Sequence, residues 1–307
     1  MISLKKAATS SPLQPVLDAL DSVILGKPEQ VRLSLACVLA RGHLLVEDVP
    51  GVGKTTLVRS LAHVLGLGTN RVQFTNDLLP ADILGTAIFD ATTKKFTFHP
   101  GPIFTNVLIA DELNRGTPRT QSAFLQAMEE RRISLDGVTR ELPMPFFVVG
   151  TQNPREQIGT YPLPESQLDR FLMRIHMGFP SPEAELQLLK GRGRRDDGLK
   201  TILSEKEVIE FQDKVDQVHC SDLILSFVQR ILTQSRSLRA DFSGLSPRAG
   251  LAILSAARAW AFLFGRDFVL PEDVQSVAPW VINHRMRFNN AAAYEKSREF
   301  VLSLPAE

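Results

Sequence analysis

The sequence predicts an α/β protein, in which a parallel sheet covered by helices on both faces is followed by a small helical domain. Two patterns in the 307 residues lead to this prediction. In the first half of the chain, short apolar runs alternate with segments of helical periodicity, which is typical of a parallel sheet buried between helices. After Pro180 the pattern becomes helical throughout. We therefore expect three parts, which are an α/β domain at 1–190, a linker at 191–200 and a helical domain at 201–307.

Five short apolar runs are the expected strands of the parallel sheet. They lie at 43–46, 72–75, 107–110, 146–150 and 171–179. The first run ends in a glycine-rich turn, and we expect a helix from Thr55 to Leu65 because apolar residues recur there on one face. Strands and helices that alternate in this way predict βαβ units.

Two segments interrupt this alternation and predict β-hairpins. Residues 86–98 alternate apolar and polar side chains around Asp90–Lys94. Residues 133–142 alternate in the same way around Asp136-Gly137, a pair that tolerates the positive φ angles of a two-residue turn. Neither hairpin belongs to a minimal α/β layer. We therefore interpret both as insertions into the α/β domain.

The second half of the chain begins with a clearly capped helix at 181–189. Ser181 is a favourable N-cap residue, and Pro182 suits the first helical position. The polar, glycine-rich run Gly191–Gly198 (GRGRRDDG) is then the best linker candidate. From Ser204 onward the helical periodicity predicts a small bundle.

Composition and charge exclude several classes of protein. With 35 Lys and Arg against 34 Asp and Glu, the formal charge is +1, so a global electrostatic grip on nucleic acid is not expected. Cys37 and Cys220 form no CxxC pair, which excludes a disulfide scaffold and a cysteine-based zinc site. The most apolar stretch, 251–265, contains Arg258 and is too short to span a bilayer. We expect no membrane insertion, no secretory signal and a cytoplasmic location.

The run from Glu47 to Thr56 (EDVPGVGKTT) is the most informative segment of the chain. A glycine-rich turn that carries Gly-Lys-Thr between a strand and a helix is typical of a P-loop, which binds phosphate through backbone N–H groups and the helix N-terminus. The usual pattern places glycine where this chain has Asp48, so an ordinary turn before a helix is the alternative interpretation. In the P-loop interpretation, Lys54 neutralises phosphate charge and the Thr55 hydroxyl ligates magnesium. The predicted cofactor-binding residues of this run are Pro50, Gly51, Val52, Gly53, Lys54, Thr55 and Thr56.

Three later segments strengthen the prediction of a nucleotide site. Asp111 and Glu112 end an apolar strand, where the first carboxylate suits Mg²⁺ and the second can polarise an attacking water, although a solvated strand end is the simpler alternative. Asn153 follows another strand, where its amide could orient that water. Arg170 and Arg248 could supply positive charge to a phosphate, one of them from a neighbouring subunit, although single arginines usually only solvate a surface. The sequence has no Asn-Lys-x-Asp motif, which favours an adenine nucleotide.

Taken in order, these motifs resemble those of AAA+ ATPases and, more narrowly, those of the MoxR family. In that family the first glycine of the phosphate loop is typically replaced by aspartate, as at Asp48. The resemblance extends from about Val23 to His284, nearly the whole chain. Five segments carry it, which are LLVEDVPGVGKT at 44–55, ADELNR at 110–115, QSAFLQAMEE at 121–130, GTQNP at 150–154 and YPLPE at 161–165.

The resemblance implies an AAA+ P-loop αβα sandwich with a parallel sheet, followed by a small all-helical lid domain. Ile24 and Gly26 match the segment that usually packs on adenine, and Arg115 and Arg174 also lie near the expected subunit interface. The other implied roles are the Walker A pair for Lys54 and Thr55, the Walker B pair for Asp111 and Glu112, sensor 1 for Asn153, the trans-acting arginine finger for Arg170 and sensor 2 for Arg248.

Members of the MoxR family typically form ATP-dependent hexameric rings that remodel, mature or activate partner proteins, commonly proteins with a von Willebrand factor A domain. The resemblance therefore implies ATP and Mg²⁺ as cofactors and a homo-oligomer. It also implies that assembly switches hydrolysis on, because the arginine finger acts in trans. ATP would bind between the α/β domain and the lid, and loss of the γ-phosphate would let the two rotate against each other.

Three alternatives stay open at this point. A nucleic-acid motor or a magnesium-chelatase-like motor subunit of the same AAA+ branch would carry the same two hairpins. The nucleic-acid motor is disfavoured because Thr92–Lys95 and Arg140 offer little positive charge for phosphate contacts. The chelatase subunit would require a tetrapyrrole-inserting partner. A non-ATPase interaction module would need a degenerate site, yet the Walker A and Walker B residues are all present.

Overall fold

A computed structural model describes residues 11–92, 94–153, 159–191, 198–237, 244–286 and 292–306. At its centre is a five-stranded parallel sheet with the strand order β2-β5-β8-β1-β9. The strands are β1 (Leu44–Glu47), β2 (Thr69–Gln73), β5 (Val107–Asp111), β8 (Phe147–Gln152) and β9 (Met173–Ile175). The predicted α/β fold with a parallel sheet is confirmed.

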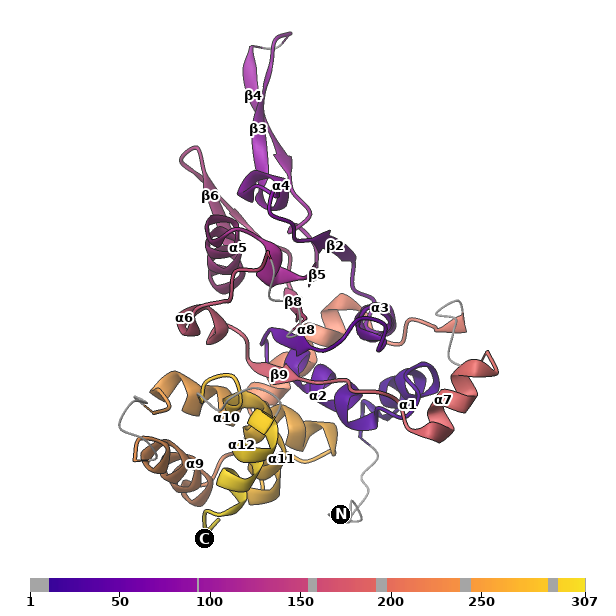
Figure 1. The fold of residues 1–307 in the computed structure, drawn as a ribbon, viewed down its shortest axis with the longest axis vertical. Helices are drawn as coiled ribbons and strands as arrows, with labels where there is room; N and C mark the ends of the chain where they lie inside the picture. Colours follow the sequence, from indigo (N-terminus) through magenta and orange to yellow (C-terminus); the bar gives the residue numbers. More distant parts are fainter. Residues whose placement is uncertain are drawn as a thin grey trace.

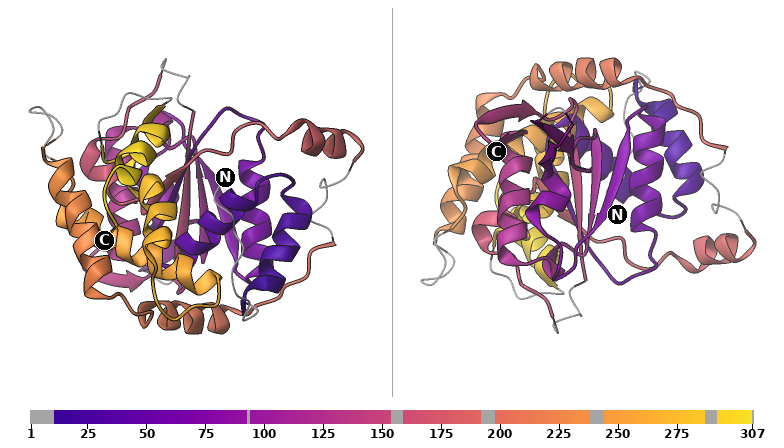
Figure 2. Two further views of the ribbon diagram at one scale, coloured as in Figure 1. Left: turned by 90° about the horizontal axis from the view of Figure 1, so that it is seen from below. Right: turned by 90° about the horizontal axis from the view of Figure 1, so that it is seen from above.

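The sheet separates two hydrophobic cores. Successive side chains of β1 point to opposite faces, so Leu44 and Val46 belong to one core and Leu45 to the other. Figure 2 shows helices on both sides of the sheet, as in an αβα sandwich. The first core is closed by α1 (Gln14–Val23), α2 (Pro28–Leu39) and α3 (Lys54–Val64), and the second by α5 (Pro118–Glu130).

Strand β9 is shorter than the apolar run 171–179 that predicted it. Its partner β1 ends at Glu47, where the chain turns into the glycine-rich loop, so the chain beyond β9 has no strand to pair with. Gly178 adopts a φ of 62°, and the chain leaves the sheet. We call residues 176–180 the strap, because this segment crosses beside the glycine-rich loop and leads to α7 (Pro182–Leu189).

Two antiparallel hairpins extend from the sandwich toward the top of Figure 1. The long hairpin consists of β3 (Gly85–Asp90) and β4 (Lys95–Pro100) and follows the short helix α4 (Pro80–Leu84). The short hairpin consists of β6 (Arg132–Leu135) and β7 (Val138–Glu141). The two hairpins touch, because the Arg140 guanidinium carbon lies 4.0 Å from the centroid of the Phe98 ring, a cation–π contact.

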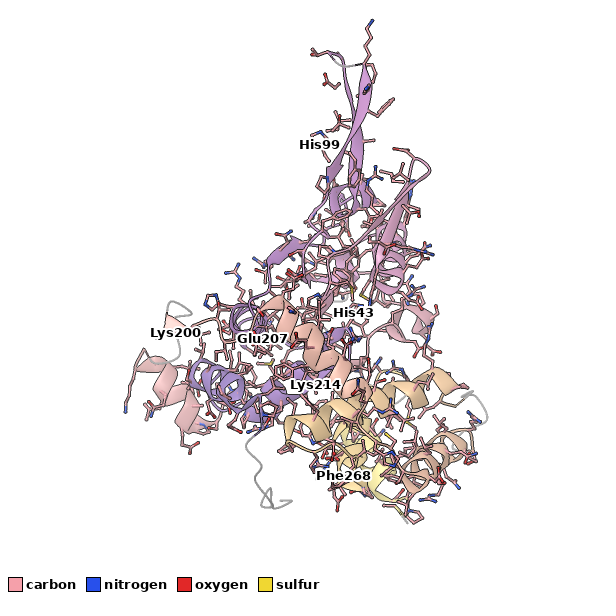
Figure 3. All side chains as sticks on the ribbon, turned by 180° about the vertical axis from the view of Figure 1, so that it is seen from behind. His43, His99, Lys200, Glu207, Lys214 and Phe268 are labelled. Atoms are coloured by element: carbon pink, nitrogen blue, oxygen red, sulfur yellow. The ribbon has the colours of Figure 1, made fainter. Side chains whose placement is uncertain are left out.

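The second half of the chain is helical. Helices α9 to α12 gather at the end of the molecule opposite the hairpins (Figure 1), and α8, which carries Glu207 and Lys214, lies between them and the sandwich (Figure 3). None of the helices in the described part of the chain is long and apolar enough to cross a membrane. Most of the predicted linker, 192–197, lies outside the described residues. The helix bounds are α8 (Glu205–Asp216), α9 (Asp222–Ser235), α10 (Pro247–Leu263), α11 (Pro271–Ile282) and α12 (Ala293–Leu302).

The residues that follow α11 are tied to the edge of the sheet. Arg285, whose side chain is 7% exposed, donates from Nε to Asp169 Oδ1 at 2.6 Å and from Nη2 to the Phe171 carbonyl oxygen at 2.9 Å. Asn283 accepts from Arg174 Nε at 3.2 Å and donates to the Arg174 carbonyl oxygen at 3.0 Å. We call these five residues the lid joint. Separating these largely buried polar groups would cost free energy. The lid joint therefore holds the lid against β9 of its own chain.

Candidate nucleotide site

A glycine-rich loop connects β1 to α3 at the carboxyl end of a central strand. Gly51 has a φ of 85° and Gly53 a φ of 93°, in the left-handed region that favours glycine. Helix α3 begins at Lys54, so its first backbone N–H groups face the loop. Backbone donors together with the positive end of the helix dipole bind anions well. The residues Pro50 to Thr56, singled out in the sequence, form this loop and the first turn of α3.

Asp48, which stands where the usual loop pattern has glycine, anchors the beginning of the loop. Its Oδ1 accepts from the Val49 N–H at 2.8 Å, and its Oδ2 accepts from the Gly178 N–H at 2.6 Å. The first bond closes the turn, and the second joins the loop to the strap. Glycine could make neither bond, so the replacement adds an anchor to the loop.

Lys54 lies between the loop and the carboxyl end of β5. Its Nζ donates to the Asp48 carbonyl oxygen at 2.7 Å. Burial lowers the pKa of the Lys54 ammonium, and the carboxylates of Asp48, Asp111 and Glu112 act against that shift. The ammonium is therefore placed where a polyphosphate on the loop would also approach the carboxylates of β5.

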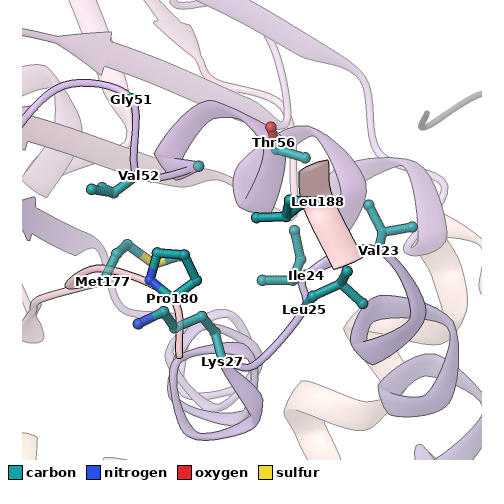
Figure 4. A pocket seen from close by; sticks show the side chains of 11 residues that line it. Val23, Ile24, Leu25, Lys27, Gly51, Val52, Thr56, Met177, Pro180 and Leu188 are labelled. Carbon is teal, nitrogen blue, oxygen red and sulfur yellow. The ribbon is translucent and has the colours of Figure 1, made fainter. Parts of the chain in front are cut away.

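A pocket of about 310 Å³ opens beside the loop (Figure 4). The loop and α3 line one part of it with Gly51, Val52, Gly53 and Thr56, while the rest is lined by apolar side chains and Lys27. Phosphate-binding donors next to apolar walls suit a nucleotide, whose base needs apolar contact. The remaining lining residues are Val23, Ile24, Leu25 and Lys27 before and at the start of α2, Met177 and Pro180 of the strap, and Leu188 of α7.

The two predicted adenine contacts differ in position. Ile24 lines the pocket, whereas Gly26 is not among its lining residues. Gly26 has a φ of 72°, and a Cβ there would lie 2.9 Å from the Ala184 Cβ, so this glycine allows α7 to approach. Sequence reasoning missed the contributions of the strap and of α7. The strap had been interpreted as the end of a strand, and no local pattern marks it as a pocket wall.

Asp111 and Glu112 lie at the carboxyl end of β5, held in place by Thr151. The Thr151 hydroxyl donates to Asp111 Oδ1 at 3.0 Å and accepts from the Glu112 N–H at 3.0 Å. Arg71 Nε lies 2.5 Å from Asp111 Oδ2, and Arg115 Nη1 lies 3.1 Å from Glu112 Oε2. Sequence reasoning missed the positions of Thr151 and Arg71, because both contacts join strands that are distant in sequence.

Asn153 follows directly after β8, which lies between β5 and β1 in the sheet. The register pairs Glu47 with Gln152 and Ala110 with Gly150, so the three strands end at the same edge. The glycine-rich loop, the two carboxylates and Asn153 therefore meet at one edge of the sheet. Ligands of open α/β sheets bind at this edge.

The two candidate arginines lie together, but away from this pocket. Arg170 pairs with Glu129 and donates from Nη1 to the Leu125 carbonyl oxygen at 3.0 Å. Arg248 Nη2 lies 2.6 Å from Glu129 Oε1, and its Nη1 lies 3.7 Å from Asp169 Oδ2. Both arginines line a second cleft, of about 280 Å³. In Figure 1, α6 (Glu165–Leu168) and α10 lie on the left, whereas α1, α3 and α7 lie on the right.

This position corrects the expectation that ATP binds between the α/β domain and the lid of one chain. Among the described residues, Arg248 and the other lid residues are not part of the nucleotide pocket. The lid joint is the physical reason. It holds the end of α11 on β9, so that α10 begins beside α5 and not above α3.

The two other arginines considered for the interface are placed differently. Arg174 is only 12% exposed at its side chain, where Nη1 lies 3.1 Å from Glu47 Oε2 and Nη2 donates to the Asn283 carbonyl oxygen at 2.8 Å. It belongs to the lid joint. Arg115 lies beside Glu112 of its own chain. Arg170 stays the predicted arginine finger, and Arg115, 41% exposed at its side chain, stays an alternative.

Comparison with known proteins agrees with this geometry. Residues 43–173 match the model of the ATPase family associated with various cellular activities (AAA), and residues 237–303 match the AAA lid domain. A crystal structure of a candidate ATPase from Cytophaga hutchinsonii superimposes with a TM-score of 0.84 and 35% identity, covering 95% of this chain and 93% of that one. The fold and the site thus define an AAA+ ATPase.

Two relatives narrow the class further. YeaC of Bacillus subtilis is 44% identical over 294 residues, covering 94% of this chain and 92% of that protein. The chaperone MoxR1 of Mycobacterium tuberculosis is 39% identical over 307 residues, covering 97% of this chain and 81% of that protein. The chain belongs to the MoxR family of AAA+ ATPases.

Proposed function

We propose that this protein hydrolyses ATP to remodel partner proteins and works as a homo-oligomeric ring of six subunits. The observation that carries the proposal is the separation of two sets of residues. The phosphate loop lines the pocket, and Asp111, Glu112 and Asn153 lie at the same edge of the sheet as the loop. Arg170 and Arg248 line the second cleft, on the other side of the subunit. A closed ring that packs one side against the other completes the site at every interface.

In this proposal, the sheet edge holds ATP with Mg²⁺. Residues Pro50 to Thr56 bind the phosphates, and Ile24 contacts the base. The Thr55 hydroxyl and the Asp111 carboxylate are oxygen donors of the kind that Mg²⁺ prefers. Bound Mg²⁺ would neutralise negative charge on the β- and γ-phosphates. Asp111 is paired here with the half-exposed Arg71, so the cation and Arg71 compete for this carboxylate.

Glu112 is the proposed general base, and Asn153 the proposed partner of the attacking water. The Thr151 hydroxyl fixes the backbone of Glu112, and Arg115 holds one of its carboxylate oxygens. The water oxygen forms a bond to the γ-phosphorus, the bond between this phosphorus and the bridging oxygen breaks, and Glu112 takes the proton. The products are ADP and phosphate.

Arg170 and Arg248 are proposed to act on the nucleotide of the neighbouring subunit. An arginine supplied in trans accelerates related phosphoryl transfers by about 10³- to 10⁵-fold, so a lone subunit would hydrolyse ATP poorly. The lid joint favours movement of each chain as one unit, with its nucleotide-binding domain at 1–190 and its lid at 201–307. The work of the cycle would then come from rotation between neighbouring chains.

The long hairpin supports a protein as the partner. Ile88, Phe89 and Phe96 are exposed on it, Phe96 to 73%, and the rings of Phe89 and Phe96 lie 5.3 Å apart between centroids. An apolar surface suits a polypeptide, whereas phosphate tracking requires a basic one. Family membership supports a partner with a von Willebrand factor A domain.

A trapped variant tests this proposal. Glu112→Gln should bind ATP without hydrolysing it, and Lys54→Ala should fail to bind it. A protein with a von Willebrand factor A domain that is enriched only on the Glu112→Gln form, and that resists nuclease treatment, would support a remodelling ATPase. Nuclease-sensitive nucleic acid on the same form would show a nucleic-acid motor instead.

A further inference from the structure

One carboxylate holds two arginines from different parts of the chain, on the side of the subunit away from the nucleotide pocket. Glu129 lies near the end of α5. Its Oε2 pairs with Nη1 of Arg170, which follows α6, and its Oε1 lies 2.6 Å from Nη2 of Arg248, which lies in the first turn of α10. Glu129 therefore sets the distance between the two guanidinium groups.

The surrounding cleft has an excess of arginine. Among the residues that the structure describes, five arginines line it together with two carboxylates, those of Glu129 and Asp169. Asp169 is bound by Arg285 at 2.6 Å and lies 3.7 Å from Arg248. Within the described ranges, Glu129 is therefore the nearest counter-ion of Arg170 and Arg248. The buried Nε of Arg170 has no hydrogen-bond acceptor among the described residues. The cleft is thus prepared for an additional anion.

We propose that Glu129 is a positioning residue, which presents Arg170 and Arg248 as a pair to the γ-phosphate of the neighbouring subunit. This inference rests on the proposed function of the two arginines. Two like charges at one place repel each other unless they share a counter-ion. Glu129 keeps both guanidinium groups at one point until the triphosphate replaces it as their common partner. Without it, the two arginines separate and cannot both contact one phosphate.

The variant Glu129→Gln removes the charge and keeps the size of the side chain. We expect the kcat for ATP of the assembled protein to fall by about tenfold or more, because charge-assisted hydrogen bonds to both arginines weaken. The Kd of a non-hydrolysable ATP analogue should stay within about twofold of wild type, because the nucleotide pocket lies on the other side of the subunit. A residue with a merely structural role would change binding, assembly and melting temperature instead.

Glu130→Gln is the matched control. Glu130 is the next residue of α5, where its Oε1 accepts from Gln126 Nε2 at 2.8 Å and its Oε2 lies 3.5 Å from Arg132 Nε. The same chemical change at this position leaves Glu129 and its two arginines in place. We expect wild-type kcat for Glu130→Gln, and the same oligomer size and melting temperature for both variants.

Mixing subunits tests whether Glu129 acts across the interface. A Lys54→Ala subunit has no working phosphate loop but intact arginines, whereas a Glu129→Gln subunit has an intact loop. In an equal mixture, about one interface in four joins an intact loop to intact arginines, so activity should rise above that of either variant alone. An equal mixture of Lys54→Ala and Arg170→Ala tests the trans action of the arginines themselves.

The two mixtures separate the possible failures. If both regain activity, Glu129 positions the trans-acting arginines as proposed. If only the Arg170→Ala mixture regains activity, or if Glu129→Gln alone has wild-type kcat, the inference about Glu129 is overturned while the trans arrangement stands. If the Arg170→Ala mixture stays inactive, the trans arrangement is wrong, and the inference about Glu129 fails with it.

Discussion

Replacing Asp48 with asparagine should weaken nucleotide binding while leaving the fold intact. The carboxylate accepts one backbone N–H from Val49 at 2.8 Å and one from Gly178 at 2.6 Å. Asparagine keeps one acceptor oxygen, but its NH₂ group then faces the other N–H, donor against donor. Losing one charge-assisted hydrogen bond and leaving a backbone donor unpaired costs about 1.5–3 kcal/mol.

The lost interaction energy should destabilise mainly the nucleotide-bound form, because Asp48 joins the loop to the strap and both segments line the pocket. A loop that relaxes without ligand must be ordered again on binding, so the Kd for ATP should rise by about 10- to 150-fold. Titration of a fluorescent ATP analogue measures the change, and Asp267→Asn, at an exposed position in the lid, is the control. A Kd for Asp48→Asn within about twofold of wild type would refute the role of Asp48 as a loop anchor.

Three further predictions concern metal binding, the lid joint and pH. Arg71→Ala should lower the Mg²⁺ concentration for half-maximal ATPase activity by up to about fivefold, because a half-exposed ion pair contributes only about 0–1 kcal/mol. A higher Mg²⁺ requirement in this variant would contradict competition between Arg71 and the cation for Asp111. Arg285→Met should lower the free energy of unfolding, measured in urea, by about 3 kcal/mol, because the carboxylate of Asp169 loses its buried partner. A decrease of less than about 1 kcal/mol would contradict a stabilising role of the lid joint. Burial lowers the pKa of His43 to about 3 and that of His284 well below its ordinary value of 6.5, so both are neutral when folded and gain protons on unfolding. The free energy of unfolding should therefore decrease by about 2 kcal/mol from pH 6.5 to pH 5.5, and a flat profile in urea titrations would exclude this effect.

The phosphate loop could be predicted from the sequence because its chemistry is local. Consecutive residues form the strand end, the turn and the first helical turn, and each needs a particular residue type. The carboxylates of β5 and the amide after β8 could also be located, because parallel strands end at one edge of a sheet. The two hairpins have clear alternation and turn residues, which are likewise local signals.

The parts that depend on tertiary contacts could not be predicted in the same way. The second bond of Asp48 goes to Gly178, which follows it by 130 positions. The position of Arg248 depends on how Arg285 and Asn283 dock on β9, and no periodicity in the lid encodes that docking. The sequence therefore suggested which residues serve the site, while the structure shows that one chain does not bring all of them together.

The specific ATPase rate as a function of protein concentration tests the central claim most directly. Oligomer size is measured on the same samples. If the site is shared between subunits, the rate per subunit should rise steeply as rings form, by up to about 10³-fold, and be close to background in dilute monomer. A rate per subunit that stays constant from monomer to ring would contradict a shared site.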